Sequence, residues 1–285
     1  MEHGFEALPC EGTEGACVNS WLAISTNAFE LFAQRWQADS GTCNGGLKWQ
    51  YNPSSMGYYY KNSVTNGGFF QTAARLARYT GNQTFADWAG RIWDWSTGVG
   101  LVSAGFHVFD GAGDADTANC SEISQDQWSY NAATYLHGAA NMYAFSSGDE
   151  QTKWETRVLG LLGAANATFF SPEADAIGVM YEQNCEKTAT CTTDQTSFKS
   201  SLARWLGRTA VLVPSTSQTI MGLLQTSAQA AASGCDGYGN STCGMKWWAN
   251  GFDGQSDLGV QLSALEVVLS LLVASAPGVA VPVAA

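Results

Sequence analysis

The chain has 285 residues and a formal net charge of −12, with 13 Lys and Arg against 25 Asp and Glu. This acidic balance argues against nucleic acid or an anionic membrane as a partner, because both are themselves negatively charged. Charged residues make up only 13% of the chain, whereas aromatic residues reach 12% and include 11 Trp. A weakly charged, aromatic-rich chain suits a neutral polymer whose rings can stack on aromatic side chains.

Helical periodicity predicts eight helices that are joined alternately by short turns and by long loops. In chain order, the expected helices cover about 20–38, 65–79, 84–102, 125–145, 150–170, 195–213, 215–233 and 258–276. Short turns make antiparallel helical hairpins, and stacked hairpins place all the long loops on one face. Loops of this length are usually functional in compact domains. The sequence therefore predicts an all-α toroid of helical hairpins with a cleft on its loop face.

The number of helices indicates an incomplete ring, since the first and last helices have no hairpin partner within the chain. We expect one domain over residues 1–276, followed by an apolar tail over 277–285 that is too short to span a membrane. The start of the chain has neither a basic region nor an apolar stretch, so it does not read as a signal peptide. We therefore expect that an N-terminal segment with further hairpins is missing.

Eight cysteines, an even number placed in loops, predict disulfides and an oxidising compartment. Sequence spacing suggests the pairs Cys10–Cys17, Cys185–Cys191 and Cys235–Cys243, which leaves Cys43 and Cys120 for each other. Four sequons predict N-glycosylation at Asn82, Asn119, Asn166 and Asn240. Cysteines and sequons together favour the secretory pathway. With no CxxC motif and only three His, we expect no metal site, and no nucleotide motif or other cofactor signature is present.

Two long loops and the helix starts after them carry most of the candidate sugar-binding residues. Tyr60 and Asn66 follow a block rich in Gly, Tyr and Trp, where Thr65 or Asn66 could alternatively cap the next helix. Trp128, Tyr130 and Asn131 lie at the start of a later helix. Aromatic rings can stack on sugars, and amides and hydroxyls can read sugar hydroxyl groups.

Acidic residues and one further tryptophan complete the candidates. Asp126 could accept bonds from sugar hydroxyls or cap the helix that follows it. Trp247 belongs to a Trp-Trp pair in a loop, where burial in a core is a weaker explanation than in a helix. Glu182 and Glu186 are expected to be solvated or locally bonded, and Glu266 to be a buried carboxylate. Glycoside hydrolysis normally needs two carboxylates, and no convincing pair faces the predicted cleft.

Four segments carry a combination of residues found in one known family: TNGGFFQTAARLARYTGN (65–82), QWSYNAATYLHGAANMY (127–143), SFKSSLARWLGRTAVLVP (197–214) and QLSALEVV (261–268). They resemble the fungal cell-wall members of glycoside hydrolase family 76, which are mannan endo-1,6-α-mannosidases and related transglycosidases. The resemblance covers nearly the whole chain. It implies an (α/α)6 barrel of twelve helices, of which about eight are present here.

The resemblance also implies a secreted glycoprotein with disulfides, often held by a C-terminal glycolipid anchor at the plasma membrane or linked to the cell wall. The implied partner is α-1,6-mannan or another mannose-containing glycan, and no oligomer is expected. In the family, an Asp-Asp dipeptide in a GNDDQ-type motif supplies the nucleophile and the general acid/base. No position of this chain matches that motif. We therefore assign no catalytic residue and expect the isolated chain to lack normal activity.

Two other functions remain open from the sequence. A non-catalytic mannan-binding protein would use the same aromatic residues without chemistry. A polysaccharide lyase on a related α/α barrel would need a Tyr or His base, for which only His107 and His137 are suitable histidines. His137 falls in the middle of a predicted helix, where packing is the simpler explanation.

Overall fold

The computed structural model describes residues 20–115, 119–171, 173 and 175–275. This part of the chain contains eight α-helices, which are α1 (Trp21–Ala38), α2 (Ser63–Thr80), α3 (Gln83–Gly98), α4 (Ser129–Phe145), α5 (Gly148–Phe169), α6 (Phe198–Leu212), α7 (Ser217–Ser233) and α8 (Leu258–Leu269). The predicted all-α class is confirmed, and each expected helix is present. The last one is shorter than predicted, because a 3₁₀ segment over Ser270–Ser275 follows it. The predicted tail 277–285 lies outside the described residues.

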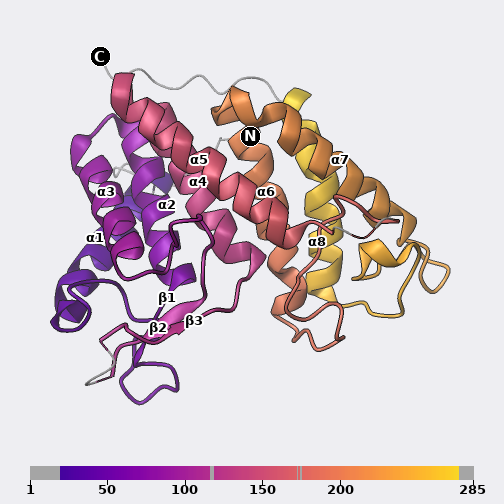
Figure 1. Ribbon diagram of the computed structural model, residues 1–285, viewed down its shortest axis with the longest axis horizontal. Helices are drawn as coiled ribbons and strands as arrows, with labels where there is room; N and C mark the ends of the chain where they lie inside the picture. The colour runs from indigo at the N-terminus through magenta and orange to yellow at the C-terminus, as the bar shows by residue number, and fades with distance from the viewer. Residues whose placement is uncertain (1–19, 116–118, 172, 174, 276–285) are drawn as a thin grey trace, which may run out of the picture.

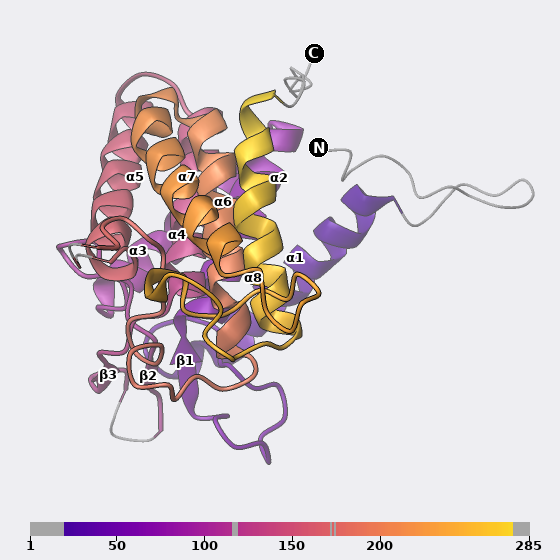
Figure 2. The same ribbon diagram turned by 90° about the vertical axis from the view of Figure 1, so that its right-hand side faces the viewer.

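The helices form two layers. In the inner layer α2 packs on α4, α4 on α6, and α6 on α8, while α3, α5 and α7 pack on the outside (Figures 1 and 2). Small residues allow the inner helices to approach closely. A Cβ atom on Gly138 of α4 would lie only 2.4 Å from the ring of Phe70 on α2. Ala73, Ala77, Ala133 and Ala140 are fully buried in the same layer.

The long loops lie together at one end of the molecule and the short turns at the other (Figure 1). This arrangement follows from the alternation of short and long connections, and it confirms that the loops share a face. A small antiparallel sheet forms within them, in the order β1 (Tyr60–Asn62), β2 (Gly111–Gly113) and β3 (Ile123–Ser124). Asn62 pairs with Gly111, and Gly111 with Ser124. The sequence analysis did not predict these strands.

Helix capping differs from the prediction at two helices. Asn62 caps α2 by accepting a hydrogen bond from the backbone N–H of Thr65, so the expected caps Thr65 and Asn66 are wrong. Asp126 is not a cap either, because α4 begins at Ser129, and Trp128 stands in the extended cap position without a side-chain bond. Asn82 and Asp257 cap α3 and α8 through their own side chains.

Three disulfides join loop cysteines: Cys43–Cys120, Cys185–Cys191 and Cys235–Cys243. These three predicted pairs are confirmed, whereas Cys10 and Cys17 lie outside the described residues. The Cys43–Cys120 bond links the loop after α1 to the loop after α3, across 77 residues of sequence.

The first and last helices expose apolar side chains. On α1, Trp21 and Leu31 are 44% and 60% exposed, and on α8 the residues Leu258 and Leu265 reach 85% and 54%. Part of the apolar surface of both helices therefore faces outward. Among the described helices, none combines the length and apolarity that a membrane crossing requires.

Candidate functional site

Asp110 connects two of the predicted binding residues on the loop face. Its carboxylate accepts a hydrogen bond from the Tyr60 hydroxyl at 2.7 Å and another from the Asn131 side-chain amide at 3.2 Å. Tyr60 begins β1, Asp110 directly precedes β2, and Asn131 lies in the first turn of α4. We call these three residues the Asp110 cluster. Asp110 was not among the residues predicted from the sequence, although an Asp-Gly step after an apolar run in a long loop is a usable signal.

Local backbone chemistry places the cluster. Gly111 allows the Tyr60 ring to lie against the backbone, because a Cβ there would be 2.5 Å from that ring. Ser63, the first residue of α2, donates its backbone N–H to the carbonyl of Asp110 at 2.7 Å. Asp110 is thereby fixed to both the sheet and the start of an inner helix.

The Asp110 cluster combines burial with unused hydrogen-bonding capacity. Asn131 is fully buried, and among the described residues its side-chain oxygen has no hydrogen-bond partner. Tyr60 and Asp110 are partly exposed. Burial and the hydrogen bond to Asp110 raise the pKa of Tyr60, so its hydroxyl stays protonated and donates at physiological pH. Polar atoms of this kind are suited to bind hydroxyl groups of a ligand.

Tyr130 and Trp128 lie beside the Asp110 cluster and pack on one ring of α6. The Tyr130 and Phe198 ring centroids are 4.0 Å apart, and Trp128 meets Phe198 edge-on at 5.7 Å. Burial raises the pKa of Tyr130, with further contributions from the negative charges of Asp110, Glu182 and Asp194. Both aromatic residues are partly exposed.

Three other predicted binding residues form no described hydrogen bond with the Asp110 cluster, although the negative charge of Asp126 contributes to the raised pKa of Tyr60. Asn66 is fully buried. Its side-chain oxygen accepts a hydrogen bond from the backbone N–H of Leu47, and its side-chain NH₂ donates to the backbone carbonyls of Leu47 and Asn62. Trp247 is 2% exposed and packs under the Lys199 ammonium, which lies 3.9 Å from its ring centroid. Asp126 is exposed and accepts only a 3.3 Å bond from Ser124 among the described contacts.

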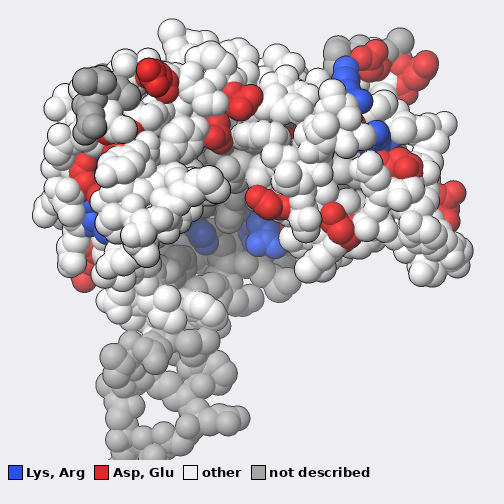
Figure 3. Space-filling model, turned by 90° about the horizontal axis from the view of Figure 1, so that it is seen from below, with Lys and Arg blue, Asp and Glu red and all other residues white. Residues whose placement is uncertain are grey.

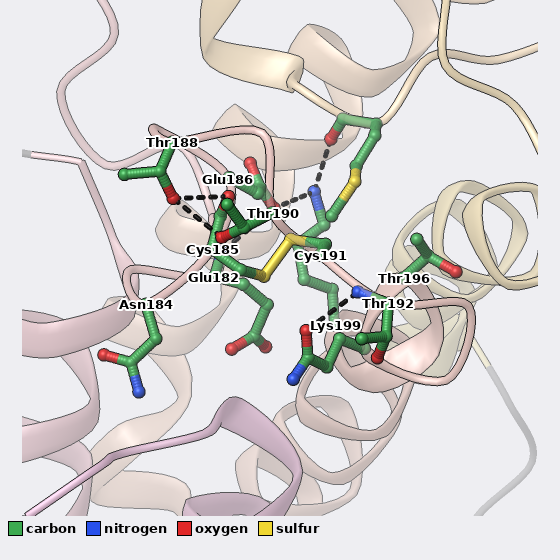
Figure 4. Close-up of a disulfide and its surroundings, with 12 residues drawn as sticks. Glu182, Asn184, Cys185, Glu186, Thr188, Thr190, Cys191, Thr192, Thr196 and Lys199 are labelled. Atoms are coloured by element: carbon green, nitrogen blue, oxygen red, sulfur yellow. Dashed lines mark hydrogen bonds and ion pairs between the residues drawn. A yellow bond between two sulfur atoms is a disulfide. The ribbon is translucent and has the colours of Figure 1, made fainter.

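A second group of polar residues is buried around the Cys185–Cys191 disulfide (Figure 4). Lys199 forms an ion pair with Glu186 at 2.7 Å and donates to the Met245 carbonyl at 2.6 Å. The other Glu186 oxygen accepts a bond from the Trp248 indole at 3.0 Å. We call Glu182, Glu186, Lys199 and Trp248 the Glu186 cluster. Glu182 and Glu186 are both fully buried, so they are not solvated, and the alternative of local bonding holds for Glu186, which accepts a bond from the backbone N–H of Glu182 at 2.9 Å.

Glu182 supplies the cap that α4 lacks locally. The backbone N–H and the hydroxyl of Ser129, the first residue of α4, both donate to its carboxyl group. Burial is the main cause that raises the pKa of Glu182 to about 8, and the neighbouring Glu186 adds to this. A carboxyl group at a helix N-terminus satisfies otherwise unpaired N–H groups. Glu182 therefore anchors the helix start that carries Tyr130 and Asn131.

The histidines and the remaining predicted acid have structural contacts. His137 is buried and stacks on Trp205 at 4.2 Å, and burial lowers its pKa well below the usual value. His107 contacts the Gln127 side chain through Nδ1 at 2.9 Å. Glu266 is buried, as predicted, and pairs with Arg204. Within the described ranges, no group of three or more His, Cys, Asp or Glu is arranged to hold a metal ion.

The predicted glycosylation sites Asn82, Asn119, Asn166 and Asn240 are all exposed. Asn119 and Asn82 nevertheless use their side-chain oxygens locally, toward the backbone N–H groups of Cys43 and Thr84. Glycosylation of these asparagines remains a prediction.

The surface at the loop end is hollowed and mostly uncharged, with basic side chains in the hollow and acidic ones around it (Figure 3). A groove of about 880 Å³ lies elsewhere, between α3 and α5, and is lined by helix residues such as Arg91 and Trp154. We place the candidate site at the loop end, because the Asp110 cluster and the exposed aromatic residues occur there.

Comparison with known proteins places this arrangement in a family. The sequence pattern of Glycosyl hydrolase family 76 matches residues 13–282. The mannan endo-1,6-alpha-mannosidase DCW1 of Saccharomyces cerevisiae is 45% identical over 253 residues, which cover 88% of this chain and 54% of that protein. DCW1 of Candida albicans is 44% identical over 263 residues, covering 90% and 56% of the two chains.

Solved structures agree with the fold. The crystal structure of Dfg5 from Chaetomium thermophilum in complex with glucosamine is 37% identical and superposes with a TM-score of 0.82, covering 93% of this chain and 64% of that one. An inactive variant of an α-1,6-mannanase from Salegentibacter, in complex with α-1,6-mannotriose, is 18% identical with a TM-score of 0.68, a likeness of fold.

The chain spans about half the length of the curated relatives it matches. Its helical hairpins have the α/α arrangement of these structures, and the match runs through all eight described helices. The chain belongs to glycosyl hydrolase family 76.

Proposed function

We propose that this chain is the mannan-binding part of a mannan endo-1,6-α-mannosidase or transglycosidase that acts on α-1,6-mannose backbones in fungal cell-wall biogenesis. The names of its relatives support the activity. The single observation that supports a sugar site in this chain is the Asp110 cluster. It presents a partly exposed carboxylate and a partly exposed tyrosine hydroxyl at the loop end of the α/α fold, and the buried Asn131 amide donates to that carboxylate.

These groups fit the chemistry of a neutral hexose. Sugar hydroxyls donate and accept hydrogen bonds, and a half-buried carboxylate accepts two of them with geometric selectivity. The rings of Trp128 and Tyr130 stand next to the cluster and offer apolar surface for the C–H face of the sugar. Specificity for mannose would come from the orientation of the hydroxyl groups that Asp110 and Tyr60 contact.

We further propose that the chain alone binds mannan without cleaving it. Cleavage of a glycosidic bond by this family's mechanism requires two carboxyl groups facing the substrate. The 285 residues contain no Asp-Asp dipeptide. The buried Glu182 and Glu186 are held by Ser129, Lys199 and Trp248 and are closed to substrate. The other possibility is a natural mannan-binding pseudoenzyme, which would show no Asp-Asp segment upstream in its transcript.

Location and assembly are also part of the proposal. Three disulfides and four exposed sequons support passage through the secretory pathway. We infer action as a monomer at the cell wall or the outer surface of the plasma membrane, with a glycolipid anchor as the means of attachment.

Isothermal titration calorimetry of the folded chain with α-1,6-mannotetraose tests the binding proposal. We expect measurable binding by the unmodified chain and an affinity loss of about tenfold or more for Asp110→Ala, since a hydrogen-bonded charged group is removed. Asp149→Ala, an exposed acid in the first turn of α5, is the matched control. Absence of binding, or equal binding by Asp110→Ala, would contradict the proposal. Hydrolysis of mannan at the rate of complete relatives would contradict the proposed inactivity.

A further inference from the structure

The loop between α1 and β1 exposes a group of large side chains next to the Asp110 cluster. Trp49 is 48% exposed, Tyr51 80%, Met56 93% and Tyr59 59%. The sequence analysis singled out this block for its aromatic residues, and the Asp110 cluster uses only Tyr60 from it. We call Trp49, Tyr51 and Tyr59 the aromatic shelf.

The rings of the aromatic shelf are held in place by neighbouring groups. Gly57, at φ +85°, lies against the Trp49 ring, where a Cβ would be only 2.5 Å from ring carbons. The Lys48 ammonium lies 4.8 Å from the centroid of Tyr59, and the Arg35 guanidinium 5.6 Å from that of Tyr51. Cations near aromatic rings contribute electrostatic attraction that fixes ring positions.

The cation behind the shelf is itself anchored in the protein. Lys48 is buried and forms a 3.0 Å ion pair with Asp114, which also accepts a bond from Thr42. Its charge is therefore balanced within the protein. The three rings of the shelf all keep exposed surface, and aromatic surface of this kind suits sugar rings.

The shelf adjoins the Asp110 cluster along the backbone. Trp49 donates its backbone N–H to the Tyr60 carbonyl at 2.7 Å, and Tyr59 directly precedes Tyr60. Tyr60 in turn bonds Asp110. A ligand seated at Asp110 and longer than one or two sugars would therefore meet the shelf as it leaves the cluster.

We propose that the aromatic shelf is an extended binding surface for a neutral polysaccharide, which stacks successive sugar rings on Trp49, Tyr51 and Tyr59 beyond the Asp110 cluster. The assignment rests on the proposed sugar binding by that cluster. It adds that longer sugar chains bind more tightly than short ones. Charge favours this occupant over a lipid surface, because the chain carries a net charge of −12 and the nearby cations already have partners on the rings or in the protein.

The test compares ligands of two lengths on the folded chain. Calorimetric titrations use α-1,6-mannobiose and α-1,6-mannohexaose with the unmodified chain and with a double variant, Trp49→Ala with Tyr59→Ala. We expect the double variant to lose about tenfold in affinity for the hexaose while the affinity for the disaccharide stays unchanged. Trp49→Phe with Tyr59→Phe, which keeps both rings, restores most of the hexaose affinity. Circular dichroism verifies folding of every variant.

Tyr238→Ala is the matched control, because Tyr238 is 70% exposed on a different loop and contacts Phe252. Equal losses for both sugars, or no loss for the hexaose, would overturn the shelf while leaving the Asp110 proposal in place. A failure of the unmodified chain to bind either sugar would instead remove the proposed function on which the shelf rests. Sedimentation with phosphatidylcholine vesicles that depends on Trp49 and Tyr59, without a length effect on sugars, would reassign the surface to lipid.

Discussion

The Asp110 cluster and the Glu186 cluster use similar groups at the starts of inner helices but differ in how far they are closed. In the Glu186 cluster, the Glu186 carboxylate pairs with the Lys199 ammonium and the Trp248 indole, and Glu182 binds Ser129. Both glutamates and the lysine are buried. In the Asp110 cluster, an amide oxygen has no partner among the described residues, and the carboxylate and phenol are partly exposed. Burial with complete internal pairing indicates an anchor, whereas the partly exposed carboxylate and phenol of the Asp110 cluster leave polar atoms within reach of a ligand.

The largest effect should come from opening the closed cluster. Lys199→Met leaves the buried Glu186 carboxylate without its cation, which costs about 3–5 kcal/mol when one partner of a buried pair is removed. Urea unfolding followed by circular dichroism measures this loss. Lys187→Ala, which breaks an exposed pair with Glu173, should change stability little. Equal small losses for both variants would show that the Glu186 cluster is not an anchor.

Removal of the disulfide above that cluster should have a smaller effect. Cys185→Ala with Cys191→Ala releases a loop of few residues, so the chain-entropy estimate gives a loss of about 2 kcal/mol. Thermal unfolding of the variant and of the unmodified chain measures the difference. A loss near that of Lys199→Met would mean that the ion pair depends on the disulfide.

The pH dependence of folding stability should reveal the raised pKa of Glu182. Its pKa is about 8 in the folded chain against 4.5 for the free group, so the folded state keeps a proton that the unfolded state releases between these values. The free energy of unfolding therefore falls as pH rises from about 4.5 to about 8, with a slope of at most about 1.4 kcal/mol per pH unit from this group. Glu182→Gln should remove that part of the slope. Parallel curves for the two proteins would contradict the assignment.

The smallest change in stability is expected in the open cluster. Tyr60→Phe removes one hydrogen bond to a partly exposed carboxylate and should cost about 1 kcal/mol of folding stability. The loss of free energy of mannotetraose binding should exceed this loss of folding stability, because the phenol hydroxyl is also proposed to form a hydrogen bond with the ligand. If Tyr60→Phe instead lost as much folding stability as Lys199→Met and kept its affinity for mannotetraose, the Asp110 cluster would be another structural anchor.

The helices could be predicted from the sequence because each carries an apolar pattern over several turns. Two of the observed disulfides could be predicted because their cysteines are close in sequence, and the third because Cys43 and Cys120 remained. The strands escaped prediction, since β1 and β2 have three residues each, β3 has two, and β2 reads Gly-Ala-Gly. Such segments carry no periodic signal.

The site was harder to predict because its contacts join distant parts of the chain. Glu182 looked like a loop acid, but its partner Ser129 is 53 residues away. That same contact replaces the local cap that Asp126 was expected to provide. Trp247 looked suited to a cleft, but Lys199 from another helix covers it. Tyr60 and Asn131 were both predicted to bind sugar, and the structure joins them through Asp110. Their role in binding remains a prediction.

The Cys43–Cys120 disulfide has a practical consequence for anyone handling the protein. The exposed loop that carries Tyr51 and Met56 lies between these two cysteines in sequence. Loops of this kind are preferred sites of proteolytic nicking. A chain cut there remains covalently joined until a reductant is added, so an intact band on a non-reducing gel does not prove an intact backbone. Paired gels with and without reductant would detect such nicking before any binding measurement is interpreted.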